Sequence, residues 1–324
     1  GRPGPTVLLR GDMDALPLQE DNPVDFASRH EGVMHACGHD AHVAMLASAA
    51  RLLSEHKDEL TGKVRFMFQP GEEGYHGAKY MIEEGVLDGV DRAFAIHVTT
   101  SVANGLFGTR GGPLLASADR FEITVHGKGG HASAPHNAID PIPAAAAMVA
   151  DLQTVITRDI DPTEAAVLTV AHLKAGTTNN VIPPSAFLEG TIRTFDESVR
   201  AKVHEGVHRV AAGTASSHRC SCSSHIEPGY PVTSNDPDQA ELVGEVATAL
   251  LGGDEFRVMP KPLFAAEDWS YVLNEVPGAM VMMGVCPDGV LPHEAEPNHS
   301  NLMEVNESAL HRGVGLYAAM ALAG

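Results

Sequence analysis

Cysteine is scarce in this chain and long apolar runs are missing, and each absence excludes a class of protein. Four cysteines among 324 residues are too few for a disulfide framework. Cys220 and Cys222 lie too close together for an easy bridge and have no second cysteine pair to close a zinc site, so we expect unbonded thiols there. Cys286 follows an apolar run and is expected to be buried at the end of a strand.

No apolar run approaches the roughly 20 residues needed to cross a bilayer. The first residues, Gly1–Pro5, lack the basic and then apolar pattern of a signal peptide. We therefore expect a cytoplasmic protein without a membrane partner. The length and the 44% hydrophobic content are sufficient for two domains with their own cores.

Basic residues are also few: the chain has 22 Lys and Arg and 42 Asp and Glu, for a formal net charge of -20. This balance argues against nucleic acid as a partner, because phosphate binding depends on basic patches. An arginine in uncharged surroundings, such as Arg193, becomes a candidate contact for an anionic group.

Strand and helix patterns alternate in the first third of the chain and again near its end. Short apolar strands are predicted at 7–9, 64–68 and 93–96, with helices over 39–56 and 79–84. The pattern returns with a helix over 237–251, a strand over 279–283 and a helix over 310–322. We predict an α/β domain, residues 1–116 and 229–324, with a mixed, mainly parallel sheet covered by helices on both faces.

Residues 117–228 show a different order, β-α-β-β-α-β. Strands are predicted near 120–126, 166–173, 186–193 and 220–227, and Pro141 and Pro143 open the first helix. Asp196 is the expected N-cap of the second helix. This order predicts an inserted α+β domain of the ferredoxin-like type.

Polar side chains follow three of the predicted strands. Asp12 and Asp14 follow the first, Glu72 and Glu73 the second, and His97 the third. Because functional sites of open α/β sheets form beyond the carboxyl ends of the strands, we expect these side chains to converge.

Cys37 and His39 lie on a glycine turn that enters a helix, where alternate residues can point at one ion. Thiolate, imidazole and carboxylate together suit Zn²⁺, Mn²⁺, Co²⁺ or Ni²⁺ rather than Ca²⁺ or Mg²⁺. His35 and His42 are alternative ligands, since His39 and His42 would share a helix face. Of the adjacent Glu72 and Glu73, one can bind metal while the other takes a proton from a metal-activated water.

Several segments resemble the M20 metallopeptidase family, most closely its amidohydrolase branch of hippurate hydrolases, N-acyl-amino-acid amidohydrolases and auxin-conjugate hydrolases. The resemblance covers almost the whole chain. It is carried by these segments: Arg10–Pro17, Met34–Asp40, Gln69–Gly74, Ala95–His97, Gly127–His136, Asn179–Pro183 and Gly190–Arg193.

The resemblance implies a zinc-peptidase-like catalytic domain with two divalent metal ions per subunit (Mn, Zn, Co or Ni). Cys37 would bridge the ions. Glu73 and His299 would bind one ion, and His39 and His97 the other.

The resemblance also implies roles for residues that do not bind metal. Glu72 would be the general base and later the acid, and Asp14 would orient the site. His131 would stabilise the oxyanion, often across a dimer, and Asn180 and Arg193 would contact substrate. Arg193 would pair with the carboxylate of an amino acid, and the inserted domain would close as a lid and support a homodimer or higher homo-oligomer.

The implied activity is metal-dependent hydrolysis of the amide bond of N-acyl amino acids, hippurate-like or N-acetylated. A carboxypeptidase or dipeptidase of the same family is the alternative. A binding module with a vestigial site is disfavoured because all the implied ligands are present. Relatives carry a helical segment before the first strand, so we expect this chain, which begins almost at Val7, to be shortened at its start.

Overall fold

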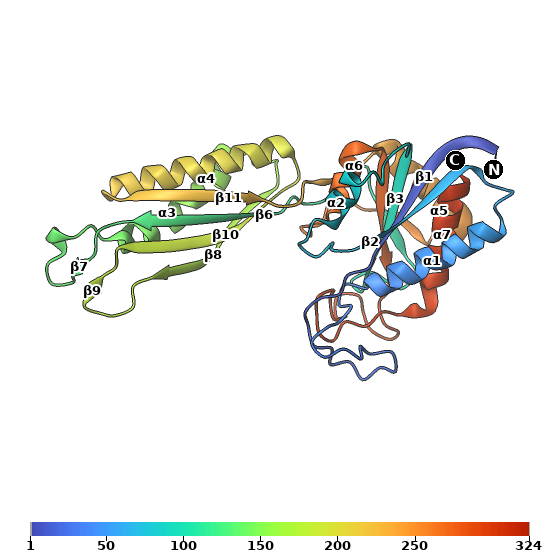
Figure 1. Ribbon diagram of the computed structural model, residues 1–324, viewed down its shortest axis with the longest axis horizontal. Helices are drawn as coiled ribbons and strands as arrows, with labels where there is room; N and C mark the ends of the chain where they lie inside the picture. Colours follow the sequence, from blue (N-terminus) through green and yellow to red (C-terminus); the bar gives the residue numbers. More distant parts are fainter. Residues whose placement is uncertain (1, 324) are drawn as a thin grey trace. The chain divides into compact units, whose positions relative to one another are not determined.

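The structure is a computed structural model that describes residues 2–323, and these fall into two compact units (Figure 1). The first unit comprises the chain up to Leu114, Thr233–Pro262 and the chain from Glu267 on. The inserted unit comprises Leu115–Val232 with the short segment Leu263–Ala266.

A six-stranded sheet forms the centre of the first unit, in the order β13-β4-β14-β3-β1-β2. Its strands are β1 (Arg2–Asp12), β2 (Thr61–Gln69), β3 (Arg92–Thr99), β4 (Phe107–Thr109), β13 (Phe256–Val258) and β14 (Gly278–Gly284). Neighbouring strands are parallel except for β4 and β14. The prediction of a mixed, mainly parallel sheet is therefore confirmed.

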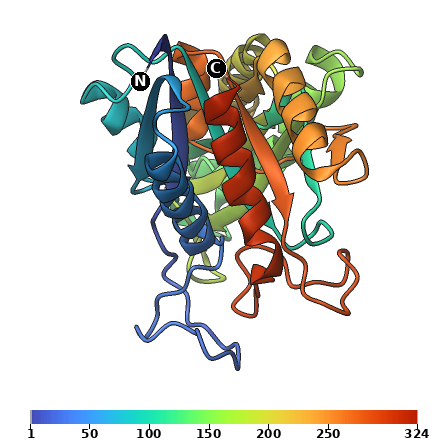
Figure 2. The same cartoon turned by 90° about the vertical axis from the view of Figure 1, so that its right-hand side faces the viewer.

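Helices cover both faces of this sheet. On one face lie α1 (His39–Glu55), α5 (Pro237–Leu251) and α7 (Leu310–Leu322), with α1 and α7 side by side (Figure 2). On the other lie α2 (Gly77–Glu83) and α6 (Trp269–Glu275) (Figure 1). The short β4, β13 and α6 were not predicted.

The inner strand β1 lies between β3 and β2 and is buried on both faces, as expected for a parallel strand with neighbours on both sides. All six residues from Val7 to Asp12 are buried. One face of β1, with Val7 and Leu9, packs on α1 through Met45, Leu46 and other apolar side chains. The expectation that Asp12 follows the strand is wrong, because Asp12 is its last residue and pairs with Gln69 of β2.

The inserted unit is a four-stranded antiparallel sheet in the order β11-β6-β10-β8, with two helices packed on one face. Its elements are β6 (Asp119–His126), α3 (Pro141–Thr154), β8 (Ala166–Ala175), β10 (Ser185–Thr194), α4 (Glu197–Ser217) and β11 (Ser221–Pro228). This is the ferredoxin-like order that the sequence predicts. The N-cap prediction is also confirmed, since the Asp196 carboxylate accepts hydrogen bonds from the backbone N–H groups of Ser198 and Val199.

Two further expectations concern thiols and membranes. Cys37, Cys220, Cys222 and Cys286 are all free, and Cys286 is buried just after β14, as predicted. Across residues 2–323, the helices are too short or too polar to cross a membrane.

Candidate metal centre

A glycine with a left-handed backbone conformation positions the first two candidate ligands, Cys37 and His39. Gly38 has φ 79° and is the N-cap of α1. A Cβ atom there would lie 2.4 Å from a methyl group of Val98, next to His97 on β3. Only glycine therefore lets the turn approach β3 and bring Cys37 and His39 toward His97.

Two groups of possible ligands share one thiol. Cys37, His39 and His97 each offer a ligand atom within 4.8 Å of the others, and so do Cys37, Glu73 and His299. The Cys37 sulfur lies 3.6 Å from Nε2 of His97. Within each group the atoms are close enough for one ion, and the sulfur is the atom common to both.

Backbone carbonyls orient two of the imidazoles. Nδ1 of His97 lies 2.8 Å from the carbonyl oxygen of Val98, and Nδ1 of His39 lies 2.9 Å from that of Asp14. A carbonyl only accepts, so each Nδ1 carries a proton, and in the neutral form of each ring Nε2 keeps the electron pair that can bind a metal ion. Nε2 of His39 is buried and forms no hydrogen bond with any described residue. A buried imidazole nitrogen beside a thiol and a carboxylate fits a transition metal such as zinc.

Asp14 links two of the ligand-bearing segments. Its Oδ2 accepts a hydrogen bond of 2.8 Å from the backbone N–H of Glu73, and its Oδ1 lies 3.3 Å from Nδ1 of His39. Burial opposes the charged form of Asp14, but the hydrogen bonds from His39 and the Glu73 backbone outweigh it and lower the pKa. Asp14 thus holds His39 and the Glu72–Glu73 loop relative to each other.

Glu73 and His299 meet although 226 positions separate them in the chain. Nε2 of His299 lies 3.1 Å from Oε1 of Glu73. Burial opposes the charge of Glu73, yet the hydrogen bond and positive charge of His299 lower its pKa. His299 has φ 72°, so a left-handed backbone presents its ring here.

Glu72 is buried beside this pair with 5% of its surface exposed. Burial and then the nearby Glu267 raise the pKa of Glu72 well above its usual value. Its carboxylate is also within 4.8 Å of ligand atoms of His39 and Glu73. A buried carboxyl group next to a metal site can take a proton from a water molecule and return it in a later step.

The alternative ligands His42 and His35 are placed differently. Nδ1 of His42 lies 2.5 Å from Oδ1 of Asp12, and the backbone N–H of Val98 donates to Nε2 at 2.8 Å. Both ring nitrogens of His42 are therefore used, and burial lowers its pKa to about 3 although Asp12 opposes this. His35 is absent from the ligand groups found among the described residues, and it lines a separate cavity of about 570 Å³ together with Asp40.

A cluster of buried charges that the sequence analysis did not single out lies next to the ligands. Arg10, Glu267 and Asp268 are fully or almost fully buried and form ion pairs. The sequence signals for this cluster were the place of Arg10 at the start of the family-like segment Arg10–Pro17, its charge inside the apolar strand β1, and two acids directly before the single tryptophan, Trp269.

The other candidate residues belong to the inserted unit and lie at two ends of its sheet. His131 of the short strand β7 (Gly130–His131) pairs with Val181 of β9 (Val181–Ile182), and the Ala132 N–H donates to the Asn180 carbonyl at 3.1 Å. This end lies beyond Ser185, where β10 begins. Arg193 is near the other end of β10, eight residues after Ser185. At the usual rise of a strand this separation corresponds to roughly 26 Å.

Arg193 is half-buried, and burial lowers its pKa, with Asp119 partly opposing this effect.

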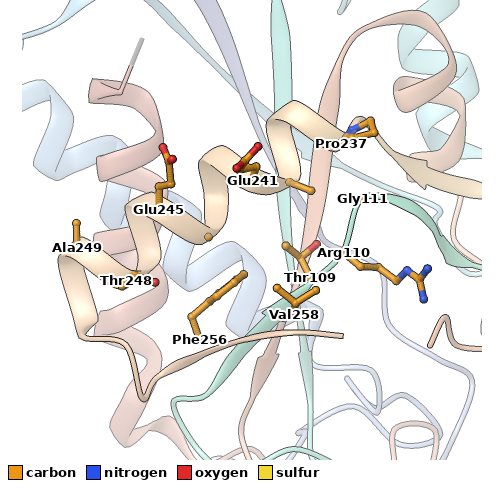
Figure 3. A pocket seen from close by; sticks show the side chains of 12 residues that line it. Thr109, Arg110, Gly111, Pro237, Glu241, Glu245, Thr248, Ala249, Phe256 and Val258 are labelled. Carbon is orange, nitrogen blue, oxygen red and sulfur yellow. The ribbon is translucent and has the colours of Figure 1, made fainter. Parts of the chain in front are cut away.

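A cavity of about 780 Å³ also lies between α5 and β13 of the first unit (Figure 3). Its lining includes Phe256 and Val258 but none of the candidate site residues.

The fold and the ligand groups define an α/β protein with a candidate metal centre, and comparison with known proteins gives the family. The chain belongs to peptidase family M20/M25/M40, whose model matches residues 8–323. It is 41% identical to thermostable carboxypeptidase 2 of Saccharolobus solfataricus, over 99% of this chain and 81% of that protein. It is 40% identical to N-acetylcysteine deacetylase of Bacillus subtilis, over 98% of this chain and 81% of that protein.

A solved structure from Bacillus subtilis, described as a dinuclear metal binding peptidase from the M20 family, is similar with a TM-score of 0.85. It is 36% identical over 99% of this chain and 81% of that chain. The resemblance noted in the sequence is thus confirmed, and the protein is a hydrolase acting on amide bonds.

Proposed function

We propose that this protein hydrolyses the amide bond of N-acyl amino acids at a two-metal centre. The observation that carries the proposal is the thiol of Cys37, which belongs to two adjacent ligand groups beside the buried carboxyl group of Glu72. Two divalent ions are supported by the dinuclear relative of known structure.

In this proposal Cys37, His39 and His97 would hold one ion, and Cys37, Glu73 and His299 would hold the other. The thiol and imidazole ligands favour Zn²⁺, Mn²⁺, Co²⁺ or Ni²⁺. When bound, the ions would supply a water of lowered pKa and a positive charge near the substrate carbonyl.

Glu72 accepts the proton of the attacking water and later gives it to the departing amine. Its burial within reach of the ligand atoms of His39 and Glu73 suits both steps, because a carboxyl group in contact with the reacting atoms can take up a proton and then return it. Asp14 keeps His39 and the glutamate loop in place through its contacts with both.

The inserted unit contributes substrate contacts. His131 stabilises the developing oxyanion, Asn180 contacts the substrate, and Arg193 pairs with the carboxylate of the amino acid. A single N-acyl amino acid is much shorter than the roughly 26 Å between the two ends of this sheet. This span supports a homodimer in which the inserted unit acts as a lid and His131 and Arg193 reach one substrate from different copies.

N-acetyl amino acids are our first choice of substrate, and hippurate-like amides belong to the same class. The deacetylase of Bacillus subtilis supports this choice. Peptide hydrolysis is a second candidate activity, because the chain is also similar to a carboxypeptidase of Saccharolobus solfataricus. Cytoplasmic residence stays a prediction from the sequence.

A substrate panel tests the proposal. The purified protein, loaded in turn with Mn²⁺, Zn²⁺, Co²⁺ or Ni²⁺, is assayed on N-acetyl amino acids, hippurate and dipeptides, with the E72Q variant as a matched control. We expect faster turnover of the N-acyl amino acids. Faster cleavage of dipeptides would favour the peptidase activity, and no turnover of any amide would refute the proposal.

A further inference from the structure

One buried guanidinium contacts several of the segments that carry candidate ligands. Arg10 of β1 is 0% exposed. Its Nη1 lies 2.8 Å from Oδ2 of Asp12, and its Nη2 donates to Oε1 of Glu267 at 2.8 Å and to Oδ1 of Asp268 at 3.3 Å. Its Nε donates to the side-chain oxygen of Gln69 at 2.9 Å.

The contacts of Gln69 and Asp268 extend this network to the glutamate loop. Gln69 is the last residue of β2, three positions before Glu72. Its amide N–H₂ donates to both carboxylate oxygens of Asp268, at 2.8 and 2.9 Å. Asp268 also accepts a hydrogen bond of 2.9 Å from the backbone of Ala78, so the chain is held on both sides of Glu72.

A second route leads from Asp12 to His97. Oδ2 of Asp12 faces Arg10, and Oδ1 lies against Nδ1 of His42. Nε2 of His42 accepts the Val98 N–H, and the carbonyl of the same Val98 accepts Nδ1–H of His97. Val98, the residue whose carbonyl orients His97, is therefore held at its N–H by His42 and, through Asp12, by Arg10.

A third route uses the backbone of Arg10. The hydroxyl group of Tyr317 donates to the Arg10 carbonyl at 2.6 Å and accepts the N–H of Ile96, the residue before His97, at 3.0 Å. Arg10 is thus connected to β3 on both sides of His97, as well as to β2.

We propose that Arg10 is a positioning residue that holds the end of β2, with Glu72 and Glu73, and the end of β3, with His97, in the geometry that binds metal. This inference deepens the proposed function and rests on it for the roles of those ligands. Arginine suits the position because its planar fork presents donors in several fixed directions at once. Lysine would keep the charge but could not meet Asp12, Gln69 and Glu267 from one point.

The R10K variant tests the proposal, with R200K as its matched control. Arg200 is also a buried arginine paired with carboxylates, those of Asp119 and Glu197, but it lies in the inserted unit. The affinity of the metal-free proteins for Zn²⁺ is measured by competition with a chelator, and kcat and KM are measured on the best N-acyl substrate. For R10K we expect about 10- to 100-fold weaker Zn²⁺ binding and a lower kcat at nearly constant KM. For R200K we expect the Zn²⁺ affinity and the kinetic constants to be close to those of the wild type.

Equal Zn²⁺ affinity in R10K and wild type, or an equal loss in R200K, would overturn the proposal. If R10K does not fold, the Zn²⁺ affinity of the Q69M variant tests the proposal instead. This variant is neutral and similar in length, so it should fold and bind Zn²⁺ about three- to tenfold less tightly, the worth of one or two buried hydrogen bonds. Unchanged affinity in Q69M would likewise overturn it. The Zn²⁺ titrations remain informative even if no N-acyl amino acid is hydrolysed, so failure of the proposed function is seen separately.

Discussion

Individual residues of the candidate centre are held by partners that fix which atom faces a metal. The carbonyls of Asp14 and Val98 accept hydrogen bonds from Nδ1 of His39 and His97, so Nε2 of each neutral ring is the nitrogen available to a metal ion. His42, one turn along the same helix face as His39, has both nitrogens occupied. The hydrogen-bond partners therefore distinguish His39, the candidate ligand, from His42, which the spacing of the two residues along the helix cannot do.

At this scale, replacing Glu72 by glutamine removes the proton acceptor but keeps the shape of the side chain. We expect E72Q to bind two equivalents of metal and to lose about 10³-fold in kcat. Elemental analysis and steady-state kinetics measure the two quantities. Turnover within tenfold of wild type would remove Glu72 from the role of base.

Replacing Cys37 by alanine removes the one atom common to both ligand groups. We expect C37A to bind fewer than two metal ions per chain, since each group loses a ligand. C220A, at a thiol in the inserted unit, is the control and should keep the wild-type stoichiometry by elemental analysis. An unchanged count in C37A would exclude a bridging role.

Arg193 provides a test of substrate recognition. Without its guanidinium, R193A should raise KM about tenfold or more for substrates with an α-carboxylate, because a charge-assisted pair is lost. Amide-capped analogues of the same substrates should be affected little. An equal loss on both kinds of substrate would contradict the pairing.

Elements of the inserted unit are joined by buried charges, which makes their stability depend on pH. Asp119 on β6 accepts hydrogen bonds from Arg200 and His204 of α4. Burial opposes the charge of Asp119, but these partners outweigh it and lower its pKa to about 2. The strand and the helix are thereby held together at one end of the unit.

A carboxyl group with a lowered pKa in the folded state stabilises above its unfolded pKa, and the stabilisation is lost as the pH falls through the folded value. Asp119 should therefore contribute about 2 kcal/mol at pH 6 and progressively less from about pH 4 to pH 2. Urea unfolding of wild type and D119N, followed by circular dichroism, should show a difference in unfolding free energy that narrows over this range. A difference that does not change with pH would contradict the argument.

At the scale of the whole molecule, residues proposed to contact one substrate lie at opposite ends of the inserted sheet. His131 and Asn180 are beyond the start of β10, and Arg193 is near its end. Such a separation is expected where subunits of a symmetric dimer exchange residues.

Mixing two inactive variants tests this arrangement. Homodimers of E72Q or of H131A should be almost inactive. If His131 acts on the partner's site, co-expression in equal amounts should give mixed dimers with one intact site, and about a quarter of the wild-type activity. No recovery, with mixed dimers verified by mass spectrometry, would place His131 in its own subunit's site.

Much of the fold could be predicted because its signals are local. The helices α5 and α7 were predicted with approximate bounds that agree with those observed, and Asp196 marked the start of α4. The polar residues at the ends of β1, β2 and β3 predicted one edge of the sheet as the place of chemistry. The three-residue strands β4 and β13 were missed because so few positions cannot show a period.

The sequence by itself determined which donor atoms are available and from which strand ends they come. Side-chain chemistry and the alternation of strands and helices are properties of neighbouring residues. Only the tertiary structure decided that both ring nitrogens of His42 already have partners and that Arg10 contacts Glu267. These contacts join residues far apart in the chain and depend on how the sheet and helices pack, which no local pattern encodes.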